Sequence, residues 1–373
     1  MKFSISREAL LRPLTLVAGV VERRQTLPVL SNVLIQVEGD QVSLTGTDLE
    51  VELIGRTVAS QVDQEGAATV PARKLMDICK SLPDQSDIQL AVEEGRAVLR
   101  SGRSRFTLST LPAAEFPNIE DADGSQEISV PRGTLKHLIE ATSFAMAQQD
   151  VRYYLNGMLL EIQSNLLRTV ATDGHRLAMC SRPIDISVNQ SQKLIVPRKG
   201  ILELSRLLDD SDEPVSLTLG STHVRAHTGD FTFTSKLIDG KFPDYERVVP
   251  RNGDKVLIAE RAELRQVLSR TAILSNEKYR GVRLYLEENN LKVMANNPEQ
   301  EEAEENVAVE YNGGAMEVGF NVGYLVDVLS VLDEDRVQVT LADPNSSALL
   351  EEPGGGDALY VVMPMRLSHP LAP

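Results

Sequence analysis

The chain repeats one pattern of helical and strand-like segments three times along its 373 residues. A segment with helical periodicity opens each third, at residues 7–14, 132–139 and 261–268. The interval is about 125 residues, far longer than the ~20–50 residues of a solenoid repeat, so each repeat is long enough to be a domain. The sequence therefore predicts three similar domains in tandem.

Each third also holds a second helical segment with one apolar face. In the first third, Leu75, Cys79 and Leu82 recur at the spacing of such a face, and residues 196–208 and 318–332 repeat it. Between the helices, apolar and polar residues alternate, which is typical of antiparallel strands. We therefore expect α+β domains, each with two helices and many antiparallel strands.

Polar and turn-forming residues cluster between the thirds, at residues 119–127 and 250–255. These clusters indicate linkers between domains. The expected divisions are residues 1–123 for domain 1, 124–252 for domain 2, 253–367 for domain 3 and 368–373 for a C-terminal extension.

The net charge of −16, from 38 basic and 54 acidic residues, argues against tight wrapping of nucleic acid. The charge is unevenly distributed, because the six helical segments together are net positive and the other segments hold the whole negative excess. Helices that all face one way would form a basic lining inside an acidic exterior. A sparse basic lining binds phosphates weakly and without sequence preference, which permits sliding along DNA.

Similar domains in tandem can meet head to tail, and such contacts continue as a filament or close into a ring. Closure would also cover the sheet edges at the two ends of the chain. Opposite charges would steer this contact, since residues 299–305 hold five carboxylates and arginines lie at the end of the first third. The residues expected at the junction are Arg96, Arg103, Arg105, Phe106 and Leu108 in the first third and Ile273, Leu274, Glu299, Glu301, Glu302 and Glu305 in the last third.

No segment reaches the ~18 consecutive apolar residues of a membrane-spanning helix, and the first residues lack the apolar core of a secretion signal. Two cysteines, Cys79 and Cys180, are too few for a disulfide scaffold or a cysteine-based zinc site. A reduced cytoplasm is the expected compartment. We expect no cofactor and no metal ion.

Motifs for catalysis are weak. The sequence contains neither a phosphate-binding loop nor a nucleophile elbow. His223 and His227 lie in a strand-like stretch at a spacing too wide for one metal ion, and Asp173 with His175 lacks an activated nucleophile. The residues alone leave two classes of function possible. One is a DNA tether that docks peptides, and the other is a hydrolase or phosphatase built on repeated α+β domains.

Several long sequence motifs are specific enough to indicate a protein family. They are TLPVLSNVL at 26–34, ATDGHRLA at 171–178, FTSKLIDGKFPDY at 233–245, ILSNEKYRGVRL at 273–284 and YVVMPMRL at 360–367. Through them the sequence resembles the beta subunit of bacterial DNA polymerase III, the family of replicative sliding clamps, over residues 1–367. The resemblance implies a ring-shaped dimer of three-domain subunits, with helices lining a central hole and antiparallel sheets forming the outer rim.

The resemblance also implies a function. A clamp encircles double-stranded DNA without sequence preference and acts as the processivity factor of replication, with no catalysis of its own. The implied partners are the replicative polymerase catalytic subunit, the clamp loader, and other polymerases and repair proteins, which dock short linear peptides. With this resemblance, the hydrolase becomes the minor alternative.

Two sets of site residues follow from the family's motifs. The peptide cleft is implied at Leu155, Thr172, Gly174, His175, Arg176, Leu177, Pro243, Arg247, Val248, Asn321, Tyr324, Ser347, Val361, Met363, Pro364, Met365 and Arg366. DNA contacts are implied at Arg24, Gln149, Tyr153, Tyr154, Arg198 and Lys199, with Arg73 as a weaker candidate.

The residues near the C-terminus partly suit a peptide-binding cleft. Met363 and Met365 offer flexible thioethers that suit a groove for several different peptides, although alternate residues of a last strand can also simply pack in a core. The family pattern ends at residue 367, whereas this chain continues through residues 368–373. We expect that deleting this extension leaves the affinity for partner peptides unchanged or raises it.

Overall fold

The computed structural model describes residues 1–23, 26–119 and 126–366. They form two compact units, each built from two stretches of the chain. Unit 1 consists of Met1–Lys136 and Val196–Asp239, and unit 2 of His137–Ile195 and Gly240–Pro373. Each unit combines residues from two of the expected domains, so the three domain boundaries stay a prediction.

The elements of unit 1 come mainly from the first third of the chain. They are β1 Lys2–Ser6, α1 Arg7–Val20, β2 Asn32–Glu38, β3 Gln41–Thr47, β4 Val51–Val58, β5 Gln61–Gln64, β6 Gly66–Pro71, α2 Ala72–Ser81, β7 Asp87–Glu93, β8 Arg96–Ser101, β9 Ser104–Ser109, β10 Gln126–Pro131, α4 Arg198–Ser205, β15 Pro214–Leu219, β16 His223–Thr228 and β17 Phe231–Lys236.

The elements of unit 2 come from the middle and last thirds. They are β11 Gly157–Gln163, β12 Leu166–Thr172, β13 Arg176–Pro183, β18 Lys255–Glu260, α5 Arg261–Thr271, β19 Gly281–Glu287, β20 Asn290–Asn296, β21 Glu302–Ala308, β22 Met316–Asn321, α6 Val322–Val331, β23 Arg336–Leu341, β24 Ala348–Glu351 and β25 Ala358–Val362. Helix α3 Arg132–Glu140 and strand β14 Gln192–Pro197 contribute residues to both units.

Each unit contains one eight-stranded sheet and one smaller sheet, with antiparallel pairing in the strand ladders from β1 to β9, from β15 to β17 and from β18 to β25. Unit 1 holds the orders β10-β15-β16-β17-β4-β3-β2-β6 and β5-β1-β7-β8-β9. Unit 2 holds the orders β14-β11-β12-β13-β25-β24-β23-β18 and β21-β20-β19-β22. The predicted α+β class with antiparallel sheets and two helices in each third is confirmed.

The six α-helices of the described residues share one local construction: each begins at the residue that directly follows a strand. Two have a side-chain cap, since the Ser6 hydroxyl accepts from the Ala9 N–H at 3.2 Å and the Asn321 side chain accepts from the Gly323 N–H at 2.9 Å. The predicted helical segments are therefore confirmed. Their first residues, such as 70–71, belong to the preceding strand.

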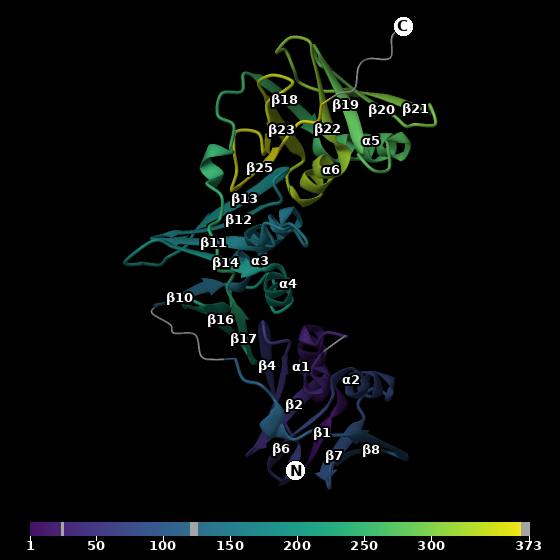
Figure 1. Ribbon diagram of the computed structural model, residues 1–373, viewed down its shortest axis with the longest axis vertical. Helices are drawn as coiled ribbons and strands as arrows, with labels where there is room; N and C mark the ends of the chain where they lie inside the picture. Colours follow the sequence, from purple (N-terminus) through teal and green to yellow (C-terminus); the bar gives the residue numbers. More distant parts are fainter. Residues whose placement is uncertain (24–25, 120–125, 367–373) are drawn as a thin grey trace. The chain divides into compact units, whose positions relative to one another are not determined.

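Paired helices pack against the sheets within each unit, with α1 beside α2 and α5 beside α6 (Figure 1). The predicted apolar face of α2 is buried through Leu75 and Cys79. Gly46 of β3 lets α1 lie close to the sheet, because a Cβ there would stand only 2.8 Å from the Val17 carbonyl oxygen. In the parts of the chain described here, no helix is long and apolar enough to cross a membrane.

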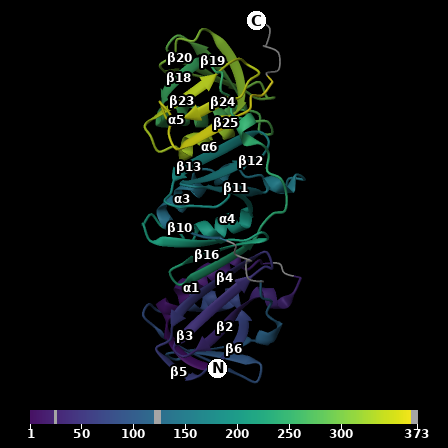
Figure 2. The ribbon, with the colours of Figure 1, turned by 90° about the vertical axis from the view of Figure 1, so that its left-hand side faces the viewer.

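The eight-stranded sheets arise because strands of neighbouring thirds pair with each other. In unit 1, β17 pairs with β4, and Phe231 lies opposite Gly55. In unit 2, β25 pairs with β13, and Ala358 lies opposite Cys180. Figure 2 faces the second sheet, with β23 to β25 in yellow and β11 to β13 in teal.

In the two smaller sheets, the strands at these same two positions of the repeat are edge strands. Strand β21 holds the place in the last third that β4 and β13 hold in the others, and it ends the four-stranded sheet. Strand β9 corresponds to β17 and β25, and it ends the five-stranded sheet. Among the residues described, no strand pairs with the outer edge of either β9 or β21.

Candidate functional site

The side chain of Arg176, at the start of β13, is held on several sides within unit 2. Its guanidinium donates to Asp173 Oδ2 at 3.2 Å and to the Phe144 carbonyl oxygen at 3.1 Å, and it also bonds the Asp327 carboxylate. It lies over the Tyr324 ring, with 4.5 Å from Cζ to the ring centroid. These contacts fix a cation and an aromatic ring as one rigid surface.

The turn before Arg176 is built by its own polar groups. The Asp173 Oδ1 atom accepts from the N–H groups of His175 and Arg176 at 2.9 and 3.1 Å, and Gly174 has a φ of +88°, which favours glycine. Asp173 is thus the cap of a turn. The His175 ring is stacked on Tyr324, with centroids 6.3 Å apart.

The end of the described chain meets this turn. The Met363 N–H donates to the His175 carbonyl oxygen at 3.0 Å, and the Met365 N–H donates to the Gly319 carbonyl oxygen at 2.8 Å. The Met363 side chain is 47% exposed, and Val248 is exposed as well. The structure therefore brings His175, Tyr324 and Met363, all predicted cleft residues, onto one surface.

Not every predicted cleft residue offers its side chain to that surface. Leu155, Thr172, Leu177 and Val361 are buried. They support the surface from below, because they occupy inward positions of strands or short turns. Exposed positions are Gly174, His175, Arg247, Val248, Met363 and Arg366, and half-buried positions are Arg176, Pro243, Asn321, Tyr324, Ser347, Pro364 and Met365.

A buried polar cluster, which sequence reasoning missed, anchors the segment that carries Pro243, Arg247 and Val248. Glu161 of β11 is only 2% exposed, and the Tyr245 hydroxyl lies 3.0 Å from both of its carboxylate oxygens. Because Tyr245 belongs to the short helix Tyr245–Arg247, this contact holds the segment on the sheet.

Two cations and an amide compensate the Glu161 charge. Arg168 and Lys193 approach the carboxylate at 3.5 and 3.6 Å, and the Gln163 side chain donates to it at 2.8 Å. Arg168 also donates to the Tyr245 hydroxyl at 2.7 Å. Burial raises the pKa of Tyr245, so its hydroxyl stays protonated and can donate to the carboxylate.

The predicted DNA-contact residues fall in both units. In unit 2, Gln149 has a φ of +53°, and the Tyr153 and Tyr154 rings meet edge to face with Tyr153 exposed. In unit 1, Arg73 donates to the Val21 carbonyl oxygen at 2.9 Å, and Arg198 is half-buried. Arg24 lies outside the described residues.

Lys199, whose DNA contact stays a prediction, has several partners within unit 1. Its ammonium group bonds the Val20 carbonyl oxygen at 2.8 Å, the Glu22 carboxylate at 2.5 Å and the Asp48 carboxylate at 2.6 Å. Two carboxylates therefore already balance its charge. The prediction missed this because Glu22 and Asp48 lie far from Lys199 in the chain.

The predicted junction residues lie on or near the terminal strands, and their role stays a prediction. Arg103, just before β9, and Arg105 on β9 are exposed, whereas Leu108 of β9 is buried within the subunit. Ile273 is 76% exposed. The Arg270 guanidinium, 2.7 Å from Glu305, lowers the pKa of that carboxyl, so the glutamate stays ionised.

The remaining junction residues share these positions. Arg96 is exposed at the start of β8, Phe106 and Leu274 are half-buried, and Glu299, Glu301 and Glu302 are exposed in or beside β21.

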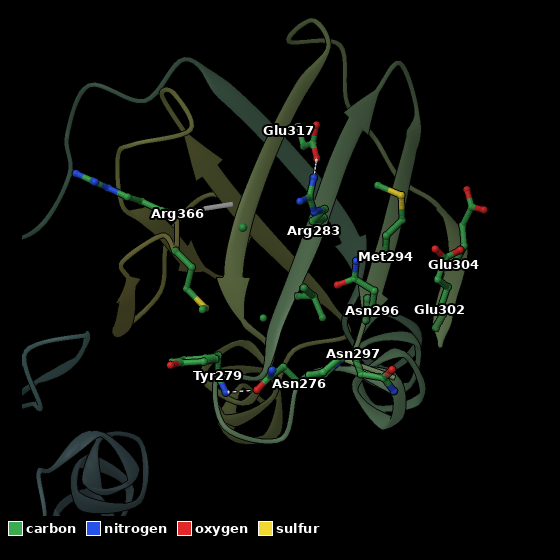
Figure 3. A pocket seen from close by; sticks show the side chains of 17 residues that line it. Asn276, Tyr279, Arg283, Met294, Asn296, Asn297, Glu302, Glu304, Glu317 and Arg366 are labelled. Carbon is green, nitrogen blue, oxygen red and sulfur yellow. Dashed lines mark hydrogen bonds and ion pairs between the residues drawn. The ribbon is translucent and has the colours of Figure 1, made fainter. Parts of the chain in front are cut away.

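A hollow of about 1010 Å³ lies on the face of the four-stranded sheet that points away from its core (Figure 3). Arg283 of β19 and Glu317 of β22 form an ion pair at 3.0 Å within it, and Glu304 of β21 lies on the other side. It shares only Met365 and Arg366 with the predicted cleft. The hollow is thus a different surface from the cleft.

Both cysteines are buried and free of disulfides. Burial raises the pKa of Cys79 to about 11. Burial, aided by the Asp357 carboxylate, raises the pKa of Cys180 to about 12. Neither thiol is therefore an activated nucleophile at neutral pH.

The histidines of β16 also show no catalytic arrangement. The His223 and His227 rings contact the hydroxyls of Thr222 and Thr232 at 2.8 and 3.0 Å, as expected of surface strand residues.

We predict that Tyr245→Phe lowers the free energy of unfolding of unit 2 by about 1–2 kcal/mol, because Glu161 loses a hydrogen-bond donor while buried. Urea unfolding followed by circular dichroism measures the change. Tyr285→Phe, on a half-buried outward position of β19, is the matched control and should change the free energy by less than about 0.5 kcal/mol. Equal effects of the two substitutions would contradict the role given to Tyr245.

Comparison with known proteins covers nearly the whole chain. Sequence models of the DNA polymerase III beta subunit match residues 1–120 for its N-terminal domain, 129–244 for its central domain and 246–366 for its C-terminal domain. The beta sliding clamp of Pseudomonas aeruginosa is 64% identical over 367 residues, which are 98% of this chain and 100% of that protein. The beta sliding clamp of Escherichia coli K12 is 56% identical with the same coverage.

A solved structure agrees with these matches. The crystal structure of the Pseudomonas aeruginosa sliding clamp bound to griselimycin superposes with a TM-score of 0.95 at 64% identity, over 98% of this chain and 100% of that chain. The chain therefore belongs to the DNA polymerase III beta subunit family, the bacterial replicative sliding clamps.

Proposed function

We propose that two copies of this chain close head to tail around duplex DNA, and that partner proteins dock peptides on the Arg176–Tyr324–Met363 surface of unit 2. As a replicative sliding clamp, the chain is a processivity factor of DNA replication. Its relatives are named as clamps, which are non-catalytic subunits of the polymerase, and the hydrolase alternative gains no support. The terminal strands β9 and β21 carry the proposal of closure.

The repeat suggests how these two strands meet. In both internal pairings, a strand of the β4 and β13 type lies antiparallel to one of the β17 and β25 type. Strands β21 and β9 are the remaining members of the two types. An open edge of backbone N–H and C=O groups favours pairing with another strand. We therefore infer that β21 of one subunit pairs with β9 of the other.

The internal pairings also predict a register. Equivalent positions are found from the neighbouring ladders, where Thr47 lies opposite Glu52 and Asn296 opposite Glu302. On the other side, Leu99 lies opposite Phe106 as Ala226 lies opposite Phe233. Transferring the pairing of Phe233 with Leu53 therefore places Phe106 of one subunit opposite Ala303 of the other.

Charge and apolar contacts support the same closure. The edge at β9 carries arginines and the segment at β21 carries glutamates, which favours opposite edges meeting over like edges. Ile273 is a large apolar side chain left exposed near β21, and burial in a contact would remove it from water. Two copies with two complementary ends each close without leaving a free end.

Retention on DNA would then rest on encirclement. Lys199 already has two carboxylate partners, so fewer cations are available to phosphates than the sequence suggested. Exposed Tyr153 and half-buried Tyr154 are candidates for contact with bases or phosphates. Few phosphate contacts give weak, salt-sensitive binding that permits sliding.

The peptide surface combines three properties that suit short linear partners. Arg176 is held in place before binding, which reduces the entropy cost of ordering it. The stacked His175 and Tyr324 rings form a flat wall. Met363 and Val248 are exposed apolar side chains that can adapt to different peptides.

We infer that the polymerase catalytic subunit, the clamp loader, other polymerases and repair proteins compete for this surface. Bacterial replication takes place in the cytoplasm, which is therefore the proposed location. The extension 368–373 lies outside the described residues. That its deletion leaves the affinity for partner peptides unchanged or raises it stays a prediction.

A tether should stay on closed circular DNA and be lost when the circle is cut. The labelled protein is loaded on a nicked plasmid by its clamp loader, half of the sample is linearised, and gel filtration measures the bound fraction. Ile273→Ala with Leu274→Ala should lose dimers and retention together, while Val256→Ala, an exposed control, keeps both. Equal retention on circular and linear DNA would refute encirclement.

The proposed register is tested by cross-linking. Phe106→Cys combined with Ala303→Cys should form disulfide-linked dimers under mild oxidation, because directly opposed positions bring Cβ atoms within about 4.5–5.5 Å. Thr107→Cys with Ala303→Cys is the control, since these side chains would point to opposite sheet faces. Non-reducing gels measure the yield. A linked control with an unlinked test pair would show that the register is wrong.

Griselimycin is a defined probe for the peptide surface. We expect it to bind this chain, and Met363→Asp to weaken binding at least tenfold, about 1.4 kcal/mol, by placing a charge on the apolar wall. Isothermal titration calorimetry measures the affinity. Val256→Asp, at an equally exposed apolar position of β18, should leave it unchanged. If both variants bind like the unmodified protein, the surface has been assigned wrongly.

A further inference from the structure

We propose that unit 2 contains a binding site for a divalent transition-metal ion, with Zn²⁺ as the best fit, formed by His137, Cys180 and Asp357. Their imidazole nitrogen, thiol sulfur and carboxylate oxygen atoms all lie within 4.8 Å of one another. The three residues come from α3, from β13 and from the position just before β25. No sequence motif indicated the site, because its donors are far apart in the chain.

The donor set fits zinc chemistry. Zinc commonly takes nitrogen, sulfur and oxygen ligands in a tetrahedron, and three protein ligands leave the fourth position to water. Zn–N and Zn–O bonds of ~2.0 Å and a Zn–S bond of ~2.3 Å put donor atoms ~3.3–3.7 Å apart. His137 Nε2 and Asp357 Oδ2 are now 2.9 Å apart in a hydrogen bond. A small widening of this contact, a rotation of the thiol toward it and release of the thiol proton to solvent would form the site, so binding of the ion should strengthen as pH rises.

The backbone holds the donors in place. Cys180 lies opposite Ala358 in the β13–β25 pairing, and the Ser181 N–H donates to the Asp357 carbonyl oxygen at 2.8 Å. The thiol and the carboxylate therefore occupy adjacent places in one ladder. The Tyr360 hydroxyl donates to the Ala141 carbonyl oxygen at 2.7 Å and so fastens the chain just after α3 to β25.

The site combines a buried donor with access from solvent. Cys180 is 0% exposed, whereas the side chains of His137 and Asp357 are 26% and 33% exposed. An ion can thus arrive from the His–Asp side and meet the sulfur beneath. Arg182 donates to Asp357 Oδ2 at 2.9 Å and would shift to the other carboxylate oxygen when an ion binds, as an outer-shell partner.

The surrounding charges favour a cation. The pKa of Glu352 is raised by burial and then by the carboxylates of Glu334, Asp357 and Asp333. Such a cluster of carboxylates creates a negative local potential, which concentrates divalent ions at the site. The Arg182 cation, paired with Asp357, only partly offsets it.

An ion here would join α3 to the pairing of β13 with β25. His175, Arg176 and Met363 lie at the other end of the same two strands. Binding to the folded state alone raises the thermal stability of unit 2 as the ion concentration increases. The proposal is independent of ring closure, because all three donors belong to one subunit.

The test uses Co²⁺ and Zn²⁺ with the reduced, full-length protein. Co²⁺ should give the sulfur-to-cobalt charge-transfer band and the visible bands of a tetrahedral site, and calorimetry should show one Zn²⁺ bound per chain. Cys180→Ser should abolish the charge-transfer band, and His137→Gln should weaken Zn²⁺ binding at least about tenfold. Cys79→Ser, the matched control in unit 1, should change neither result.

Circular dichroism and gel filtration check that each variant is folded. His137→Gln is the more informative variant if Cys180→Ser is unstable, because His137 is partly exposed. The proposal is overturned if the unmodified protein gives no charge-transfer band, or if that band survives in folded Cys180→Ser. Zinc affinity that is unchanged in folded His137→Gln would also overturn it.

Discussion

An unpaired strand edge is the constraint on which the rest of this structure depends. Each repeat ends its sheets with strands whose backbone groups need a partner, and neighbouring repeats meet that need twice, at β4 with β17 and at β13 with β25. The two eight-stranded sheets result directly from these pairings. The compact units cut across the expected domains for the same reason. One set of edges, at β9 and β21, has no such neighbour in the described chain.

Several charged side chains of this protein form ion pairs within the subunit. Glu161 is balanced under Tyr245 by Arg168 and Lys193, and Lys199 is balanced by Glu22 and Asp48. A partly buried charge needs a partner, since its desolvation is otherwise unfavourable. Counting cations along the sequence therefore overestimates those available to DNA. It also misses that buried ion clusters hold the segments around the peptide surface.

The sequence predicted the features that depend on local periodicity. Apolar spacing located all six helices, and alternation gave antiparallel strands, because both signals reflect which side of one element faces the core. The cleft residues came from family motifs and the junction residues from charge and apolar side chains, and both sets remain proposals. Tyr245 with Glu161 was missed because its contact joins positions 84 residues apart. The DNA contact of Lys199 came from the family resemblance and stays a prediction, and nothing near Lys199 in the chain reveals its two carboxylate partners.

The two cysteines provide a further use of the fold. Cys79 is buried in unit 1 and Cys180 in unit 2, and neither forms a disulfide. A thiol reagent can reach a buried sulfur only when the surrounding structure opens transiently. The unmodified protein thus carries one natural probe of conformational fluctuation in each half. Peptide mapping of the two modification rates would measure the local opening of each half separately, in a single sample.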